Sequence, residues 1–228
     1  MSTLPDIIRD IQRVAPDVVA RAATFQAAIL ADVAGRRGTL HGRVAPVDAK
    51  MACAGPAITV EVRPGDNLAI HAAMAIARPG DVIVVDGKGD QTAALMGTLM
   101  LSACKKIGIA GVVVDAAIRD RLELLELGFP VWSAGFNPAG PTKFVPGRIN
   151  HPISAGGCVV NPGDLVVADA DGVVVIEREK APAMLDLATK KVASEQARLD
   201  AIARNDTASP WLPAALRAAG MLQDGEAL

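Results

Sequence analysis

The sequence has no tyrosine and only four Phe and two Trp among its 228 residues, so aromatic side chains are scarce. A platform of aromatic rings on which nucleic-acid bases could stack is therefore not expected. The formal net charge is −2, and the basic residues are scattered along the chain rather than gathered into a patch that would attract a polyanion. Both deficits argue against nucleic acid as a partner.

Cysteines, long apolar runs and export signals are also scarce. Cys53, Cys104 and Cys158 lie far apart and follow no zinc-binding spacing, which suits free, buried thiols in a reducing cytoplasm. The longest apolar run, 93–104, contains Gly, Thr and Ser, and the first ten residues lack a basic region followed by an apolar block. We therefore expect a cytoplasmic protein with no signal peptide and no membrane span.

About half of the residues are apolar (51%), which is enough for a substantial core in a single domain over 1–228. Helices are expected within about residues 5–33, with a possible break at Pro16, and in a C-terminal tail over about 181–228. Between them, short valine-rich strands alternate with helices, which predicts an α/β fold. The strands are expected at 57–62, 82–85, 111–114, 129–132 and 165–168, and a helix at about 97–107. Three Pro-Gly-Asp turns, at 64–66, 79–81 and 162–164, are interpreted as strand punctuation.

The run Gly111-Val-Val-Val-Asp115-Ala-Ala-Ile-Arg119-Asp120 is the best candidate for a functional site. A buried strand ends there and delivers an arginine and carboxylates just before a helix. Ligands of α/β proteins favour the carboxyl ends of strands, and helix N-termini favour anions. An alternative interpretation is structural: Asp120 could cap the helix with Glu123 completing a capping box, and Arg119 could lie on the surface.

Common catalytic signatures are missing from the sequence. It contains no GxSxG elbow, no HExxH, no complete P-loop and no GxGxxG. Structural roles are favoured for His41, His71 and His151, and nothing local suggests that Lys88 or Lys143 forms a Schiff base. What remains is a set of oxygen ligands beside an arginine, which suits a hard divalent cation and a small carboxylate substrate.

The motifs match a known family. Gly97 followed by Arg119-Asp120-x-x-Glu123, the stretches GIAGVVVDAAIRD and LGFPVW, PGDN at 64–67, PGDVIVVD at 79–86 and NPGDLVVADADGVVVI at 161–176 closely resemble class II pyruvate aldolases. Those enzymes act on 4-hydroxy-4-methyl-2-oxoglutarate and 4-carboxy-4-hydroxy-2-oxoadipate, and their superfamily includes the ribonuclease-activity regulators. The resemblance runs from about Gly38 to Gln196. It implies an αββα sandwich of the swivelling β/β/α type, assembled as a homotrimer or homohexamer with active sites between subunits.

The resemblance also implies a role for individual residues. Asp120 resembles the protein ligand of Mg²⁺ or Mn²⁺, and Arg119 resembles the partner of the pyruvyl carboxylate and of the enolate oxygen formed on cleavage. Backbone amides of Gly97, Thr98, Leu99 and Met100 would hold the substrate carboxylate at a helix N-terminus. Lys143 resembles the contact to the distal carboxylate, and Glu195 resembles a glutamate that reaches metal-bound water from the adjacent subunit. The implied activity is metal-dependent retro-aldol cleavage of a 2-oxo diacid, a carbon-carbon lyase reaction.

The chain departs from the family pattern at Thr98, where characterised aldolases carry an acidic residue that assists proton transfer. A hydroxyl can hydrogen-bond to water but is not a base near neutral pH. Cleavage could therefore be slower or act on another substrate, and Asp86, Asp90 or Glu195 could supply the carboxylate. Oxaloacetate decarboxylation, which needs no hydroxyl deprotonation, is kept as a companion activity.

Two other function classes are weighed against the aldolase. A non-catalytic ribonuclease-binding regulator would share the fold but has no need of Arg119 and Asp120. A methyltransferase would need a glycine-rich adenosine-binding turn, which the sequence lacks. Sequence patterns leave the physiological substrate, the preferred metal and the choice between trimer and hexamer open.

Overall fold

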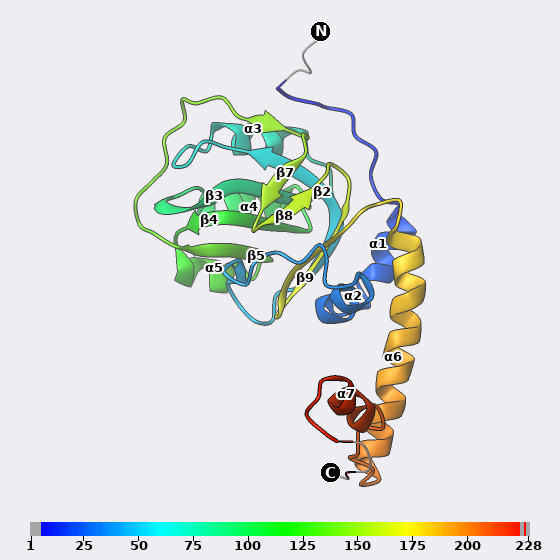
Figure 1. Cartoon of the computed structure of the whole chain (residues 1–228). Coiled ribbons are helices and arrows are strands. Elements are labelled where there is room, and N and C mark those ends of the chain that lie inside the picture. The colour runs from blue at the N-terminus through cyan, green and yellow to red at the C-terminus, as the bar shows by residue number, and fades with distance from the viewer. Residues whose placement is uncertain (1–5, 224–225, 227–228) are drawn as a thin grey trace. The chain divides into compact units, whose positions relative to one another are not determined.

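The structure, a computed structural model, describes residues 6–223 and 226, and it confirms the expected α/β fold (Figure 1). Pro5, at the start of the expected N-terminal helices, and residues 224, 225, 227 and 228, at the end of the expected tail, lie outside the described residues. The chain divides into two compact units, Met1–Thr189 and Lys190–Leu228. A single domain over 1–228 stays a prediction.

Within the described residues, eight strands of the first unit form one mixed sheet that is nearly closed. Its centre is parallel: β2 (Cys53–Glu61), β3 (Val82–Ala94), β4 (Gly111–Ile118) and β5 (Val131–Phe136) lie side by side in the order β5-β4-β3-β2. Parallel strands are buried on both faces, which explains their continuous runs of valine and isoleucine.

The remaining strands of the sheet are antiparallel additions. β1 (Ala45–Pro46) pairs with β5, β6 (Arg148–Ile149) and β9 (Leu165–Asp169) pair with β2, and β10 (Gly172–Ile176) pairs with β9. Residues Asp169 to Gly172 form the hairpin turn between β9 and β10. Residues Gly38 and Leu40, which lead into β1, hydrogen-bond to β10, so the two ends of the sheet approach each other. β7 (Ile153–Ala155) and β8 (Cys158–Val160) form a separate hairpin.

Helices pack against the sheet, and the residues buried between them form two hydrophobic clusters. One cluster joins the central strands to α3 (Leu68–Ile76), α4 (Thr98–Lys106) and α5 (Arg121–Leu127), with fully buried Ile70, Leu101 and Leu124. The other joins β9 and β10 to α1 (Pro16–Ala22), α2 (Ala27–Val33) and the first turns of α6 (Ala181–Ala203). All three cysteines are free, and burial raises the pKa of Cys53 and Cys104 to about 12, so their thiols are poor nucleophiles.

The N-terminal segment differs from the expected pair of helices. The first helix begins at Pro16, whereas residues 8–15 run without regular structure. Proline suits the first turn of a helix, where its missing N–H costs nothing, so Pro16 starts a helix instead of interrupting one. The preceding segment is tied to the sheet, because Ile8 N–H donates to Ile149 O and the Arg13 guanidinium pairs with buried Asp81.

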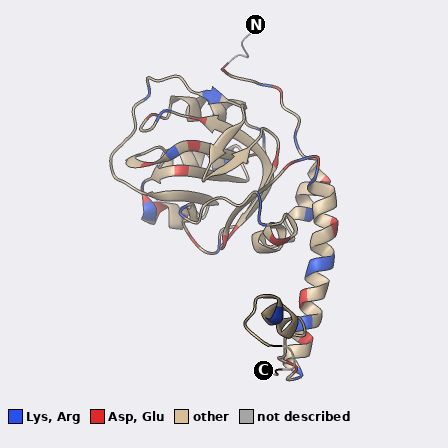
Figure 2. Cartoon of the chain, in the orientation of Figure 1, with Lys and Arg blue, Asp and Glu red and all other residues tan. Residues whose placement is uncertain are grey.

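The second unit contains the rest of α6 and α7 (Leu212–Ala218). Basic and acidic residues alternate along α6 (Figure 2), as expected for a solvated helix face. No helix in the described part of the chain is long and apolar enough to cross a membrane.

Candidate active site

The site lies at the carboxyl ends of β3 and β4, which are neighbouring parallel strands. The chain leaves β3 through 95–97 into α4, and it leaves β4 through Arg119 and Asp120 into α5. Two backbone bonds clamp these crossovers together: Leu95 N–H donates to Ala117 O, and Arg119 N–H donates to Met96 O at 3.0 Å. Residues 22 positions apart therefore meet because parallel pairing aligns the ends of the two strands.

Asp120 is held in a strained conformation against the start of α4. Its backbone is left-handed (φ 66°, ψ 44°), a region that is uncommon for residues other than glycine, although Asp and Asn adopt it more often than most. Its Oδ2 accepts a hydrogen bond from Thr98 N–H at 2.9 Å, and its Oδ1 makes no hydrogen bond to that amide. Gly97 permits this approach, since a Cβ there would lie 2.5 Å from Asp120 Oδ2.

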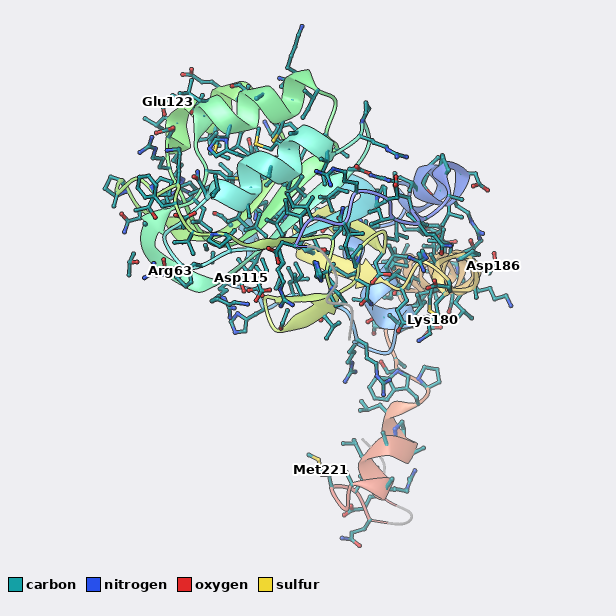
Figure 3. All side chains as sticks on the ribbon, turned by 90° about the horizontal axis from the view of Figure 1, so that it is seen from above. Arg63, Asp115, Glu123, Lys180, Asp186 and Met221 are labelled. Atoms are coloured by element: carbon teal, nitrogen blue, oxygen red, sulfur yellow. The ribbon has the colours of Figure 1, made fainter. Side chains whose placement is uncertain are left out.

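The capping-box interpretation of Asp120 and Glu123 is wrong. Asp120 occupies the N-cap position of α5, but its side chain makes no capping hydrogen bond to that helix. Glu123 is exposed on α5 at the periphery of the molecule (Figure 3). The carboxylate of Asp120 points instead to the neighbouring crossover, where it is available to a ligand.

Arg119 is half-exposed beside Asp120, with Nε 3.8 Å from Asp120 Oδ1. The loop after β5 passes close to its guanidinium, since a Cβ on Gly140 would lie 3.1 Å from one of the terminal nitrogens. Because the side chain is half-exposed, its planar fork of donors can reach an anion in the pocket.

The loop after β5 is anchored by the turn that precedes α3. Asp66 Oδ2 accepts hydrogen bonds from Thr142 Oγ1, Phe144 N–H and Val145 N–H, and Asp66 Oδ1 accepts one from Leu68 N–H. Burial opposes ionisation of Asp66, but the four hydrogen bonds outweigh it and lower its pKa to about 2. A fully ionised, buried carboxylate thus fixes the loop that carries Lys143.

These elements enclose a pocket of about 220 Å³. It is mainly apolar, with a few polar groups converging on it, as is usual for small-molecule sites. The lining residues are Asn67, His71, Ala94, Leu95, Met96, Gly97, Leu99, Met100, Arg119, Asp120, Pro141 and Lys143.

Most of the predicted site residues meet in this pocket. Gly97, Leu99, Met100, Arg119, Asp120 and Lys143 line it, and Thr98 contacts Asp120 through its backbone while its Oγ1 is buried without a hydrogen-bond partner among the described residues. Glu195 lies on α6 in the second unit, where it forms an ion pair with Lys191. Its predicted role across a subunit boundary stays a prediction.

Two carboxylates proposed from sequence as replacements for the missing acid lie elsewhere. Asp86 is buried and pairs with Lys88, and Asp90 accepts hydrogen bonds from Thr92. Neither is among the residues that line the pocket. The structure therefore gives neither of them contact with a substrate bound beside Asp120.

Sequence reasoning missed Asn67 and misjudged His71. Asn67 is buried, and its Nδ2 donates to Leu95 O at 2.8 Å, so it ties α3 to the β3 crossover. His71 was expected to be structural, but it is exposed and lines the pocket. Asn67 immediately precedes α3 and His71 lies four residues later, so both lie on one side of the helix. The i, i+4 spacing can be read from the sequence, but the sequence does not show that this side faces the pocket.

Asp120 is the residue that could hold a metal ion. No group of three or more His, Cys, Asp or Glu gathers into a metal cage among the residues that the structure describes. The donors suit a small hard cation that keeps most of its water, because Mg²⁺ is commonly bound by one or two carboxylates plus the substrate. Gly97, whose missing Cβ leaves room at Asp120, fits the same arrangement.

The chain matches a known protein family over most of its length. A family model described as "RraA-like: Aldolase/RraA" matches residues 8–175. A protein of Halalkalibacterium halodurans described as "Putative 4-hydroxy-4-methyl-2-oxoglutarate aldolase" is 43% identical over 189 residues, covering 83% of this chain and 90% of that protein.

Solved structures agree with the family match. Streptomyces coelicolor RraAS2, described as an unusual member of the RNase ES inhibitor RraA protein family, is 31% identical with a TM-score of 0.74, covering 86% of this chain and 99% of that one. A Geobacillus kaustophilus protein described as an S-adenosylmethionine:2-dimethylmenaquinone methyltransferase is 33% identical with a TM-score of 0.62, covering 67% and 94%. Proteins similar to this chain are thus described with several different functions.

Proposed function

Because this chain belongs to the RraA-like family of aldolases and regulators, we propose that it is a divalent-metal-dependent pyruvate aldolase. Its substrates would be 4-hydroxy-2-oxo diacids such as 4-hydroxy-4-methyl-2-oxoglutarate or 4-carboxy-4-hydroxy-2-oxoadipate, cleaved to pyruvate and a second 2-oxo acid. Oxaloacetate decarboxylation would be a companion activity, since it yields the same enolate. The observation that carries the proposal is the pocket in which Arg119, Asp120 and the start of α4 converge.

The residues of the chain suit the binding of a 2-oxo acid. The N–H groups of Leu99 and Met100 lie in the first turn of α4, where helix geometry provides no intrahelical acceptor, so they can donate to a carboxylate. The Arg119 guanidinium can donate to that carboxylate and to the enolate oxygen that gains charge during cleavage. Lys143, which also lines the pocket, can pair with the second carboxylate of a diacid.

Asp120 would hold Mg²⁺ or Mn²⁺, whose positive charge would stabilise the enolate oxygen without a covalent imine. The exposure of Lys143, the one lysine among the described lining residues, supports this choice, since a Schiff-base amine is usually activated by burial. The active assembly would be a homotrimer or homohexamer to which Glu195 contributes from the adjacent subunit.

A regulator that only binds a ribonuclease is the competing function. Binding of a ribonuclease does not require a left-handed Asp120 packed against Gly97. It also does not require Arg119 in a pocket of small-molecule size. These features favour the enzyme.

The deciding experiment is a panel of 2-oxo diacids assayed for pyruvate with Mg²⁺, with Mn²⁺ and after chelation. Pyruvate release that depends on the metal is expected. Asp120→Asn should abolish both turnover and Mg²⁺ binding by calorimetry while leaving thermal unfolding near that of the parent. A protein that releases no pyruvate from any member of the panel, or an Asn variant with unchanged Mg²⁺ affinity, contradicts the proposal.

A further inference from the structure

The pocket contains four ionisable side chains among its described lining residues, namely His71, Arg119, Asp120 and Lys143. An arginine guanidinium stays protonated in proteins, so Arg119 can donate hydrogen bonds but cannot accept a proton. Asp120 receives the Thr98 N–H and is the proposed metal ligand, and Lys143 is an ammonium donor on an exposed loop. Imidazole is therefore the group in this pocket best suited both to accept and to return a proton near neutral pH.

The position of His71 is fixed by the elements around it. It lies one turn after Asn67 on α3, and Asn67 bonds to Leu95 O, on the crossover that leads to Gly97. The turn before α3 is anchored by Asp66, which also holds the loop of Lys143. Hydrogen bonds thus tie the start of α3 to the β3 crossover and to the Lys143 loop, both of which line the pocket. His71 itself is exposed, so a substrate and water can reach it.

We propose that His71 is a catalytic residue, the proton-transfer group that replaces the carboxylate missing at Thr98. The inference rests on the proposed function and adds a residue to it. Thr98 cannot fill this role, because its Oγ1 is buried without a partner and a hydroxyl is not a base. Asp86 and Asp90 do not line the pocket.

The proton balance needs no further reactant. His71 takes the proton of the substrate's C4 hydroxyl as that oxygen forms a carbonyl. The C3–C4 bond breaks, and its electron pair moves into the C2–C3 bond to give the enolate of pyruvate. The protonated imidazole then returns the same proton to C3, which becomes the methyl group of pyruvate, and His71 is neutral again for the next turnover.

The test compares the parent with His71→Gln, which keeps a polar side chain but cannot carry a proton, and with His41→Gln, an exposed histidine outside the pocket. We expect kcat of retro-aldol cleavage to fall ~10²-fold or more in His71→Gln, with little change in KM. His41→Gln should match the parent. Oxaloacetate decarboxylation should fall less, because no hydroxyl proton is removed in that reaction.

A second measurement separates chemistry from structure. His71→Ala removes the ring, and added free imidazole should restore part of its retro-aldol turnover, whereas His71→Gln should not respond. A merely structural loss would not be rescued by imidazole.

Other results would overturn the inference. Unchanged kcat in His71→Gln would show that another group transfers the proton, and a rise in KM alone would make His71 a binding residue. Loss of kcat in Glu195→Gln combined with unaffected kcat in His71→Gln would give the role to Glu195. Failure of the proposed function looks different, because the parent itself would then release no pyruvate from the diacid panel.

Discussion

Gly97 illustrates how one missing side chain shapes the site. The Asp120 carboxylate occupies the space that a Cβ at position 97 would need, 2.5 Å from Oδ2, and the Arg119 side chain lies 3.1 Å from the same point. The left-handed backbone of Asp120 brings its carboxylate to this position. Glycine is therefore required here for close approach rather than for an unusual backbone angle.

Gly97→Ala should displace the Asp120 carboxylate and lower turnover by ~10²-fold, because small misplacements of catalytic groups have effects of this size. Steady-state assays and Mg²⁺ calorimetry measure the change. Gly42→Ala is the matched control, since a Cβ at Gly42 has no neighbour within 4 Å. Equal activity in the two variants would contradict the geometry assigned to Asp120.

Arg119→Lys keeps the charge but replaces a planar fork with a point-like ammonium that cannot hold two oxygens in one plane. We expect turnover to fall by ~10²–10³-fold, as when one donor to a developing oxyanion is removed. The thermal midpoint should stay near the parent's because the side chain is half-exposed. Turnover close to that of the parent would make Arg119 a structural residue.

In a His71→Gln background, where the proposed proton-transfer group is removed, Thr98→Asp should raise retro-aldol turnover of 4-hydroxy-4-methyl-2-oxoglutarate and affect oxaloacetate decarboxylation less, because only the first reaction needs a base. General-base assistance is worth ~10²–10⁴-fold, so partial recovery is measurable. Position 98 starts α4, where a carboxylate is tolerated, and its backbone already contacts Asp120. Equal changes in both rates, or none, would mean that position 98 does not limit proton transfer.

At the scale of elements, the three Pro-Gly-Asp turns share one construction. Gly65, Gly80 and Gly163 all have positive φ, and the aspartate that follows each of them is buried and donates its N–H to the carbonyl three residues earlier. This is the geometry of a type II turn, in which proline and glycine preset the two central residues. The first of these turns has an additional role, since Asp66 also holds the loop of Lys143.

Asp66→Asn should weaken that link, because an amide NH₂ cannot accept the hydrogen bonds that the carboxylate oxygen accepts. A pKa lowered from the ordinary value of 3.8 to about 2 corresponds to about 2 kcal/mol of stability at neutral pH. We expect a free energy of unfolding lower by about that amount, measured by denaturant titration, and a higher KM for diacids. Unchanged stability and KM would contradict the anchoring role.

The pH dependence follows from the direction of the shift. Folding lowers the pKa of Asp66, so its contribution is fully present above the unfolded value near pH 4 and is lost as the pH falls towards 2. The difference in stability between parent and Asp66→Asn should therefore be constant above about pH 5 and shrink in acid.

At the scale of the whole molecule, the two compact units differ in what they contain. Both hydrophobic clusters lie within the first unit, the last fully buried residue being Ala188, whereas the second unit carries Glu195. Each unit also has one tryptophan: Trp132 is fully buried in the first, and Trp211 is largely exposed in the second.

A chain that ends after Thr189 should fold and unfold cooperatively, followed by the fluorescence of Trp132, with a thermal midpoint within a few degrees of the parent's. It should lose turnover if Glu195 acts in the assembled enzyme, and full-length Glu195→Gln should reproduce that loss. Size-exclusion chromatography would report whether the protein forms the proposed homotrimer or homohexamer and whether the tail is needed for it. Full activity of the shortened chain would contradict the predicted role of Glu195.

The sequence by itself determined the central strands, the turns and part of the site. Valine runs predict the parallel strands but not their bounds, since β3 runs on to Ala94 and β5 to Phe136. Pro-Gly-Asp marks the turns, and Arg119-Asp120 directly follows β4. Gly97, Leu99, Met100 and Lys143 were identified through the family's motifs, and all of them line the pocket.

Only the tertiary structure decided which elements meet at the site and which do not. The placement of Asn67 and His71 depends on α3 packing beside the β3 crossover. Asp86 and Asp90 lie where the register of β3 against β4 becomes irregular, and neither lines the pocket. The start of α1 at Pro16 likewise depends on bonds from the preceding segment to distant parts of the sheet. Periodicity records the face of an element that is buried, but it contains no information about the neighbour against which that face packs.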